Sequence, residues 1–441
     1  MTDTHFERSN ARMALKTRND TANWAHVHDR LVPQAWPNLQ PTFRIAPGAK
    51  VFTIGSCFAR NIEEHLSLLG FELPTLEFSA PEAEWGGLRR NGILNKYTPA
   101  TVCQEIEWAA KIYERGTGFF EDDAKEMQFD TQDGQVIDLH LGGFIPVSKD
   151  RFIERRREIY DLYAHAFSAN LVALTFGLTE SWVDQNTGLH IHQAPATRQL
   201  LRAATQYDFV NLDYEACLSY MRRTVQTLRR INPEISIIIT VSPVALNATF
   251  TGRDVILANA LSKSTLCAAT GKLASEFKNL DYFPSYENAT LSPKQDAFEP
   301  DLRHVRDGFV GKIVKQLIKH YFEVPDDLSA LIQEAAVALG SNLSPDETNA
   351  FTALAQARPA FKDLSDDQLI VYLRSSWRLK DKKEIRRIGR EIMTRNTRLH
   401  RHLRAVAHIF PRCGLDEDLR TYARAVLAND ASNPLALKWA E

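Results

Sequence analysis

Short apolar runs rich in β-branched residues recur along the first two thirds of the chain, and each stops at a turn signal. They predict buried strands at 50–54, 171–176, 235–241 and 280–283. Apolar residues at helical spacing predict helices near 59–70, 213–230, 254–276 and 308–321. Alternating strands and helices are typical of an α/β fold, in which helices cover both faces of a parallel sheet. Residues 75–165 break this rhythm, and we expect insertions or extra helices there, around the sheet edge.

The two ends of the chain follow other patterns. Residues 1–48 are polar and interrupted by prolines, which predicts an extended segment before an α/β domain at 49–323. After that the strand signal stops, and residues 324–441 are expected to form an all-α domain. A period of 34 pairs Leu369 with Leu403, Ile385 with Leu419, Ile388 with Tyr422, Ile392-Met393 with Val426-Leu427 and Asn396 with Asp430. This is the length of a tetratricopeptide helix pair, and such pairs stack and usually present a groove to a protein partner.

Composition narrows the function classes. The chain of 441 residues has 53 Lys and Arg against 55 Asp and Glu, for a net charge of -2. This balance argues against a protein that coats nucleic acid or anionic lipid with positive charge. No apolar run approaches the ~18 residues of a membrane span, and the polar N-terminus lacks a signal sequence, so we expect a cytoplasmic protein.

Cysteine usage and nucleotide motifs limit the cofactors. The five cysteines are far apart and form no CxxC pair, which predicts free thiols rather than disulfides or a zinc site. The chain contains neither the phosphate-binding nor the dinucleotide-binding glycine pattern. We therefore expect no cofactor and no metal.

A serine stands at the end of the first predicted strand. Ligands of parallel α/β sheets bind beyond the carboxyl ends of the strands, and Ser56 would lie there at a helix N-terminus. Free backbone N–H groups and the helix dipole favour developing negative charge at that position, as a nucleophile requires. The alternative is a serine that only caps the helix.

A serine nucleophile needs a base and a group that orients the base. Asp301 lies three residues before His304, just ahead of the last predicted helix of the α/β domain. Within one turn, Asp301 can hold one ring nitrogen and leave the other free to take the proton of Ser56. A surface Asp–His contact that caps the helix is the alternative.

Several stretches in consistent order resemble one known family. The run Phe52 to Arg60, which contains Gly55-Ser56-Cys57-Phe58-Ala59, resembles the motif that names the GSCFA family, which is similar to the SGNH/GDSL hydrolases. Further matching stretches lie at 91–95, 175–182, 240–244 and 282–287. The resemblance covers roughly 48–322. It implies a three-layer α/β sandwich of the SGNH hydrolase type, with Ser56, Asp301 and His304 as catalytic residues.

The resemblance also implies the groups that stabilise an oxyanion. Gly92 to Asn95 would lie where such enzymes supply one donor, and Gly177 to Glu180 where they carry Gly-x-Asn-Asp. Thr179 replaces the asparagine of that pattern, so Asn95 or the backbone N–H of Ser56 would carry more of the stabilisation. Glu180 would order Thr179 or a substrate hydroxyl, or else form a buried salt bridge.

Other residues compete for functional roles. Cys57 is a rival nucleophile, although most buried cysteines only pack. His190 and His192 could form half of a metal site, but without a third ligand they fit a pocket rim better. Trp182 and Trp85 could stack on sugar rings or belong to the core. The basic runs 155–157 and 380–383 are expected to be solvated helix faces.

Two functions remain. The first is a serine esterase or O-acyltransferase that acts on a small-molecule or glycan ester through an acyl-enzyme on Ser56. The carbohydrate substrate is an analogy with related hydrolases. The second is a non-catalytic protein that keeps the fold and recruits a protein partner through its C-terminal helices. No nucleic acid is expected in either case.

Overall fold

A parallel sheet forms the centre of the computed structural model, which describes residues 11–85, 91–324, 327–340, 345–395, 400–429, 431 and 433–440. Across the sheet, its strands are β1 (Val51–Gly55), β4 (Leu171–Phe176), β8 (Ser236–Val241) and β9 (Leu280–Phe283). All neighbouring pairs are parallel, so the carboxyl ends of the strands lie along one edge of the sheet. The predicted strands are confirmed to within one residue at each end.

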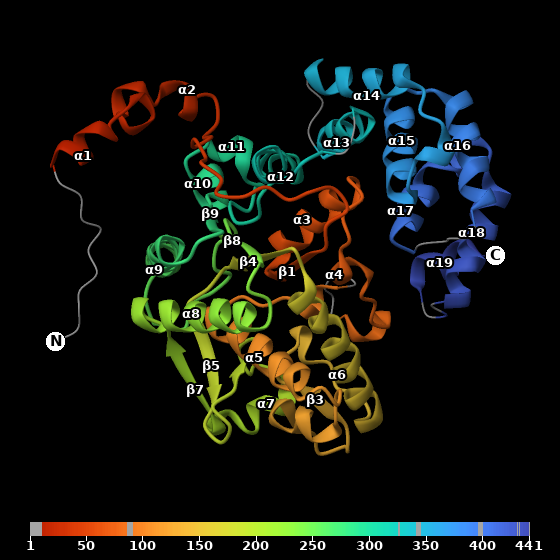
Figure 1. Cartoon of the computed structure of the whole chain (residues 1–441). Helices are drawn as coiled ribbons and strands as arrows, with labels where there is room; N and C mark the ends of the chain where they lie inside the picture. The colour runs from red at the N-terminus through yellow and green to blue at the C-terminus, as the bar shows by residue number, and fades with distance from the viewer. Residues whose placement is uncertain are drawn as a thin grey trace.

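Helices cover both faces of this sheet (Figure 1). One face packs against α5 (Pro99–Arg115), α6 (Lys149–Ala164), α8 (Tyr214–Ile231) and α9 (Val255–Glu276). The other face packs against α3 (Cys57–Ser67) and α12 (Asp307–Tyr321). Side chains alternate along a strand, so Phe52 joins the first core and Val51 the second. The α/β fold is therefore confirmed, and the region at 75–165 supplies two helices of one face rather than only an edge.

Smaller elements surround the central sheet. Residues 128–138 form a hairpin of β2 (Gln128–Asp130) and β3 (Val136–Asp138). A separate antiparallel sheet follows β4, with the order β6-β5-β7, and consists of β5 (Glu180–Asp184), β6 (His190–Ile191) and β7 (Tyr207–Asn211). Short helices complete the domain: α4 (Pro74–Glu77), α7 (Arg198–Leu201), α10 (Ser285–Thr290) and α11 (Lys294–Ala297). The sequence pattern did not predict these short elements.

The described part of the N-terminal segment starts at residue 11. It contains the short helices α1 (Ala11–Lys16) and α2 (His28–Leu31), so the prediction of an extended segment is wrong for these residues. The residues that follow α2 form neither helix nor strand and lie against the α/β domain. The backbone N–H of Ala35 donates to Ser292 Oγ at 2.8 Å, and Ile45 forms a parallel bridge with Phe322. Residues 35–45 therefore belong to the packed structure of the domain.

Beyond residue 326 the described chain is helical, as predicted. Its helices are α13 (Asp327–Leu339), α14 (Pro345–Ala357), α15 (Asp366–Arg378), α16 (Lys382–Thr394), α17 (His400–Ile409), α18 (Asp416–Asn429) and α19 (Pro434–Trp439). They share a core of their own. The helices α17 and α18 begin 34 positions after α15 and α16, respectively, so the period of the sequence is a repeat of helix pairs. The predicted pair Asn396 and Asp430 lies outside the described residues.

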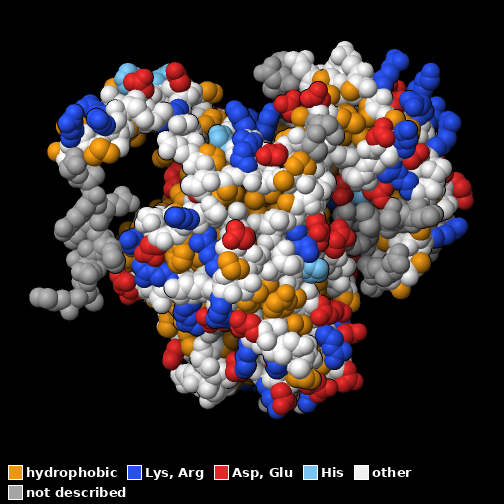
Figure 2. All heavy atoms as spheres, in the orientation of Figure 1, with side chains coloured by type: hydrophobic (Ala, Val, Ile, Leu, Met, Phe, Trp, Pro, Cys, Tyr) orange, Lys and Arg blue, Asp and Glu red, His pale blue; other side chains and the backbone are white. Residues whose placement is uncertain are grey.

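The helical region joins the α/β domain through close contacts. A Cβ on Gly311 of α12 would lie 3.2 Å from Val337 of α13, so these two helices approach closely. Further along, Gln368 Nε2 donates to the carbonyl of Leu68 at 2.8 Å. On the described part of the face in Figure 2, acidic and basic side chains are interspersed. Among the described residues, no helix combines the length and apolar character that a membrane crossing requires.

Candidate active site

The first strand ends at a glycine that the fold requires. Gly55 has φ of +150°, and a Cβ built on it would lie 2.4 Å from the carbonyl oxygen of Thr175 on β4. A side chain at this position would therefore overlap the neighbouring strand. Because glycine has no side chain, the backbone at Gly55 can lie close to β4 just before the chain turns into α3. Ser56 follows directly.

Ser56 lies at the N-terminus of α3, where the sequence placed it. Its backbone is extended, and its Oγ accepts a hydrogen bond from the backbone N–H of Phe58 at 3.3 Å. The side chain is buried, with 3% of its surface exposed. Ser56 therefore caps the helix, and the same position lies in the field of the positive end of the helix dipole. Capping and nucleophilic roles are compatible at this place.

A short segment crosses the carboxyl ends of β1 and β4. The backbone N–H of Lys96 donates to the carbonyl of Gly55 at 2.9 Å. The carbonyl of Tyr97 accepts hydrogen bonds from the N–H groups of Gly177 and Leu178, at 2.8 and 3.0 Å. These bonds hold the segment beside the end of β1, and thus beside Ser56. The region expected to supply an oxyanion donor is therefore close to the candidate nucleophile.

Asn95 has an amide with spare hydrogen-bonding capacity. It follows a buried turn at Gly92–Leu94 and is itself 4% exposed. Its Nδ2 makes one long contact of 3.4 Å with the hydroxyl of Tyr97, and its Oδ1 has no partner in the described structure. A buried amide that is incompletely bonded costs free energy unless a ligand satisfies it. Asn95 is accordingly the better placed of the expected side-chain donors.

Asp301 and His304 form the expected hydrogen bond. Asp301 Oδ2 lies 2.6 Å from His304 Nδ1, and Asp301 Oδ1 also accepts from the backbone N–H of His304 at 3.0 Å. The hydrogen bond from His304 holds the pKa of Asp301 below its usual range. His304 therefore carries its proton on Nδ1 when neutral. About half of each side chain is exposed, at 52% and 48%.

The second ring nitrogen of His304 is engaged by its neighbour. Arg303 Nη1 lies 2.7 Å from His304 Nε2, and Arg303 Nε donates to the carbonyl of Ala245 at 3.1 Å. Ala245 follows the carboxyl end of β8, so the turn at 301–304 lies at the same sheet edge as Ser56. The structure describes no hydrogen bond between Ser56 and His304. In this arrangement Arg303 occupies the nitrogen that a general base would use.

The residues after β4 support the fold around this edge. The hydroxyl of Thr179 donates to Asn211 Oδ1 at 2.8 Å, so its one proton is not directed at a substrate. Glu180 accepts from the hydroxyl of Thr249 and from the backbone N–H of Phe250, which fastens the loop after β8. Among the described residues Glu180 forms no ion pair, so these contacts do not include the alternative of a buried salt bridge. The carboxylate orders a loop instead.

Trp182 lies in an aromatic cluster of the small antiparallel sheet. Its ring centroid is 5.2 Å from those of Phe209 and Phe250. Trp85, the other candidate for stacking on a sugar, is half-buried and donates its indole N–H to the carbonyl of Ala80 at 2.8 Å. Both indoles therefore contribute to packing within the protein.

A profile of the GSCFA family matches residues 50–317, which is more than half of the chain. The chain belongs to the GSCFA family. The match begins with β1 and ends within α12, so it covers the sheet, Ser56 and the 301–304 turn and leaves the C-terminal helices outside. Neither the curated proteins nor the solved structures include a significant match to this chain. The family resemblance drawn from the Gly55–Ala59 motif is confirmed.

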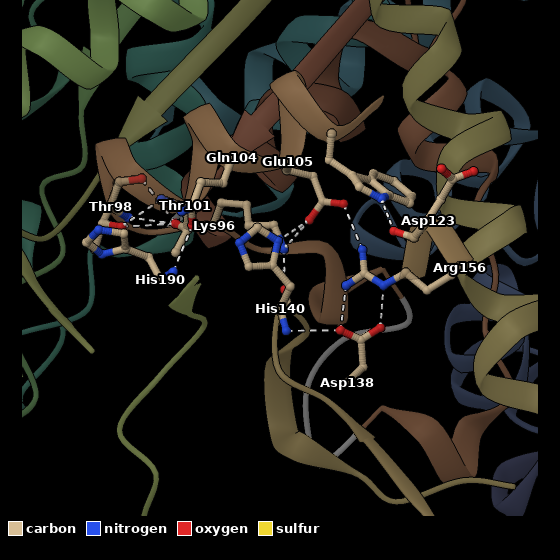
Figure 3. A network of polar contacts seen from close by, with 11 residues as sticks. Lys96, Thr98, Thr101, Gln104, Glu105, Asp123, Asp138, His140, Arg156 and His190 are labelled. Atoms are coloured by element: carbon tan, nitrogen blue, oxygen red, sulfur yellow. Dashed lines mark hydrogen bonds and ion pairs between the residues drawn. The ribbon is translucent and has the colours of Figure 1, made fainter. Parts of the chain in front are cut away.

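The GSCFA domain contains a buried charge network that the sequence did not reveal (Figure 3). Lys96 Nζ lies 2.9 Å from Glu105 Oε2, and Arg156 Nη1 lies 2.9 Å from Glu105 Oε1. Arg156 also binds Asp138 through two hydrogen bonds, and His140 Nδ1 lies 2.6 Å from Glu105 Oε2. All five side chains are at most 1% exposed. The network fixes Lys96, and with it the segment that crosses β1 and β4.

The protonation states in this network follow from burial and charge. Burial lowers the pKa of His140 to about 4, and the charge of Lys96 acts in the same direction. Burial alone would raise the pKa of Glu105, but Lys96 and Arg156 hold it well below its usual range. His140 is therefore neutral and donates its Nδ1 proton to a charged Glu105. Its Nε2 has no partner within the described structure.

The basic run at 155–157 contradicts the prediction of a solvated face. Arg155 and Arg156 are 2% and 0% exposed, because the inner face of α6 carries them into the domain. Arg155 Nη1 pairs with Glu84 at 3.1 Å. The partners lie far away in the sequence, so a local pattern could not reveal them. The run at 380–383 is exposed, as predicted.

Glu63, on α3, is a second buried carboxylate with several partners. Glu63 accepts hydrogen bonds from Thr53, from Thr75 at 2.7 Å and from Asn91 Nδ2 at 3.1 Å. Arg60 Nη1 lies 2.7 Å from its Oε1. Burial nevertheless raises the pKa of Glu63. These bonds tie β1 and α3, on either side of Ser56, to the turn that precedes Gly92.

The two histidines of the small sheet, His190 and His192, make contacts with side chains of the protein. His190 Nδ1 lies 2.8 Å from the hydroxyl of Ser181, and its Nε2 lies 3.0 Å from that of Tyr220. The ring centroid of His192 lies 5.2 Å from that of Tyr97, with the two rings tilted against each other. Among the described residues, no group of three or more His, Cys, Asp or Glu side chains could hold a metal ion.

The cysteines whose side chains the structure describes are unpaired with one another. Cys103, Cys217, Cys267 and Cys413 are free thiols. Burial raises the pKa of Cys103 and of Cys217 to about 12, so these two thiols are protonated and unreactive at neutral pH. The side chain of Cys57, the rival nucleophile, lies outside the described residues.

Proposed function

We propose that this GSCFA protein is an SGNH-type serine esterase or O-acyltransferase whose substrate is an ester of a carbohydrate or glycoconjugate. The observation that supports it best is the Asp301–His304 pair at the sheet edge where Ser56 begins α3. A carboxylate on Nδ1 orients the imidazole and stabilises the imidazolium that forms during catalysis. Ser56, at a helix N-terminus, has the electrostatic environment that a developing oxyanion needs.

The reaction divides into two steps. Ser56 Oγ attacks the ester carbonyl while His304 Nε2 takes the hydroxyl proton, and a tetrahedral oxyanion forms. The oxyanion collapses, and the alcohol leaves with the proton from His304, so that an acyl-enzyme remains. Water, or a sugar hydroxyl in a transferase, then attacks the acyl group by the reverse sequence. Backbone N–H groups near Ser56 and the amide of Asn95 would hold the oxyanion.

This reaction requires one rearrangement. Arg303 must release His304 Nε2, and the imidazole must turn its free nitrogen toward Ser56. Arg303 and His304 are both in a surface turn, and catalytic hydrogen bonds often form only in the substrate complex. The substrate would thus complete the catalytic arrangement. Thr179 takes no part in this scheme, because its hydroxyl donates its hydrogen bond to Asn211.

The carbohydrate substrate rests on analogy with SGNH hydrolases, because a fold does not determine a substrate. The repeated helix pairs beyond residue 326 resemble tetratricopeptide repeats in their spacing of 34 residues. Such a region would bring the α/β domain to a protein partner or contribute to substrate binding. Either role is compatible with the esterase chemistry.

Hydrolysis of p-nitrophenyl acetate tests the proposal. Ser56→Ala and His304→Ala should each lower kcat/KM by about 1,000-fold or more, because the two residues act as a unit. The matched controls are Ser275→Ala, an exposed serine on α9, and His26→Ala, an exposed histidine near the N-terminus. Equal hydrolysis by all five proteins would exclude the esterase function.

A non-catalytic binding protein is the second candidate. The contact between Arg303 and His304 Nε2 favours it, since an imidazole bonded to Asp301 and Arg303 can serve only to hold the 301–304 turn. In that case wild-type protein would hydrolyse the ester no faster than the Ser56→Ala variant. The same assay therefore separates the two functions.

A further inference from the structure

A cavity of about 1190 Å³ lies between the GSCFA domain and the C-terminal helices. One wall is the outer face of α3, from Asn61 to Leu68, together with the start of α12 at Asp307. The opposite wall comes from α13, α15 and α17, which are alternate helices of the helical region. Cavities that bind small ligands are typically ~300–1,000 Å³, so this one has room for several sugar rings.

Two arginines on the helical wall have no partner among the described residues. Arg374 and Arg378 lie one turn apart on α15, line the cavity and are exposed to it. Neither makes a hydrogen bond or close ion pair with a described residue. Desolvation and the charge of Arg378 lower the pKa of Arg374, whereas Glu64 and Asp307 from the opposite wall counteract them. The pair therefore gains from an added anion, and guanidinium groups bind carboxylates through two parallel hydrogen bonds.

Other groups in the cavity suit a sugar chain. His65, on α3, has a buried Nδ1 without a partner in the described structure. Burial lowers its pKa to about 4, so the neutral ring can exchange hydrogen bonds with hydroxyl groups. The indole of Trp377 also lines the cavity, and its ring centroid is 5.8 Å from that of His408. An indole face can pack against the apolar face of a sugar ring.

The cavity starts close to both candidate catalytic residues. Asn61 is five positions after Ser56 on α3, which corresponds to about 7.5 Å along a helix axis. Asp307 is three positions after His304. A chain bound along α3 would thus have one end near the sheet edge where Ser56 begins the helix. This location favours a glycan over an acidic peptide as the occupant.

We propose that this cavity binds a carbohydrate chain that carries carboxylate groups, with Arg374 and Arg378 as the anion-binding pair. The chain would present its ester to Ser56, and this part of the inference rests on the proposed function. The binding itself does not require the reaction, because the cavity and Ser56 consist of different residues. The two claims can therefore fail separately.

Isothermal titration of hexagalacturonate into the full-length Ser56→Ala protein measures the binding without turnover. Arg374→Ala/Arg378→Ala should raise the Kd by about tenfold or more, because each hydrogen bond to a charged group is worth roughly that factor. The matched control is Arg420→Ala, which removes an exposed arginine from α18, paired with Glu417 outside the cavity. This control should bind like the parent.

Two more titrants test the chemical class. Maltohexaose, which is neutral, should bind more weakly than hexagalacturonate, and a hexaglutamate peptide should bind more weakly as well. The inference is overturned if hexagalacturonate does not bind, if the double variant binds like Arg420→Ala, or if either other titrant binds as tightly. Circular dichroism on each variant establishes that the fold is retained. If the wild-type protein binds hexagalacturonate but hydrolyses p-nitrophenyl acetate no faster than Ser56→Ala, the proposed function alone is refuted.

Discussion

Replacing Arg156 with methionine removes the guanidinium from the centre of the buried charge network and keeps most of the side-chain volume. Arg156 binds Asp138 through Nε at 2.6 Å and Nη2 at 2.5 Å, and Glu105 through Nη1 at 2.9 Å. Glu105 would keep Lys96 and His140 as partners. Among the described residues, the Asp138 carboxylate would keep only its hydrogen bond from the backbone N–H of His140. Asp138 therefore loses more of its compensating hydrogen bonds than Glu105 does.

The expected cost follows from the burial of both partners. Removing one member of a buried ion pair destabilises a protein by about 3–5 kcal/mol, because the remaining charge stays without compensation. For a domain of this size, such a loss corresponds to a decrease in Tm of roughly 10 °C. Differential scanning calorimetry measures both quantities.

Arg157→Met is the matched control for this experiment. Arg157 is the exposed neighbour on α6, where its guanidinium lies 5.8 Å from the ring centroid of Phe119. Its replacement should cost no more than about 1 kcal/mol. Converting Asp138 to leucine in the Arg156→Met protein should recover part of the loss, because no buried charge then remains unpaired at that position. Equal Tm values for Arg156→Met and Arg157→Met would refute the reasoning.

Three more predictions concern the site and its support. Gly55→Ala should destabilise the protein by at least about 3 kcal/mol in urea unfolding, because the new Cβ overlaps Thr175; near-wild-type stability would contradict this. Burial lowers the pKa of His140 from 6.5 to about 4, so the ring becomes protonated at a lower pH in the folded state than in the unfolded chain. Stability should therefore fall as the pH decreases from 6.5 towards 4, by up to about 3 kcal/mol, and a flat urea midpoint over this range would exclude it. Arg303→Ala should free His304 Nε2 and raise the rate of p-nitrophenyl acetate hydrolysis by up to about tenfold, whereas loss of activity would assign Arg303 a positive role.

The central sheet could be predicted because its strands are fully buried. Residues 171–176 and 236–241 are apolar or β-branched almost throughout, a pattern that parallel strands share and few other elements match. The small antiparallel sheet was missed for the opposite reason. Its strand β5 is only partly buried and mixes charged, polar and aromatic residues. The local signal there is too weak to separate a strand from a loop.

The candidate site also contains features that the sequence predicts and contacts that it does not. The positions of Ser56 and of the Asp301–His304 pair follow from local order, because a strand end, a helix start and a one-turn spacing are visible in the sequence. The contact of Arg303 with His304 Nε2 depends on side-chain conformation, which the sequence pattern does not contain. Similarly, Glu105 on α5 meets Arg156 on α6 only after the two helices have packed against each other. Long-range charge pairs of this kind have no local signature.

A fluorophosphonate probe tests the central claim most directly, because it forms a covalent bond only with an activated nucleophile. The folded protein is incubated with the probe, digested and examined by mass spectrometry, together with the Ser56→Ala and His304→Ala variants. We expect an adduct on Ser56 that disappears in the first variant and forms far more slowly in the second. An adduct on Cys57, or no adduct on the folded wild-type protein, would contradict it.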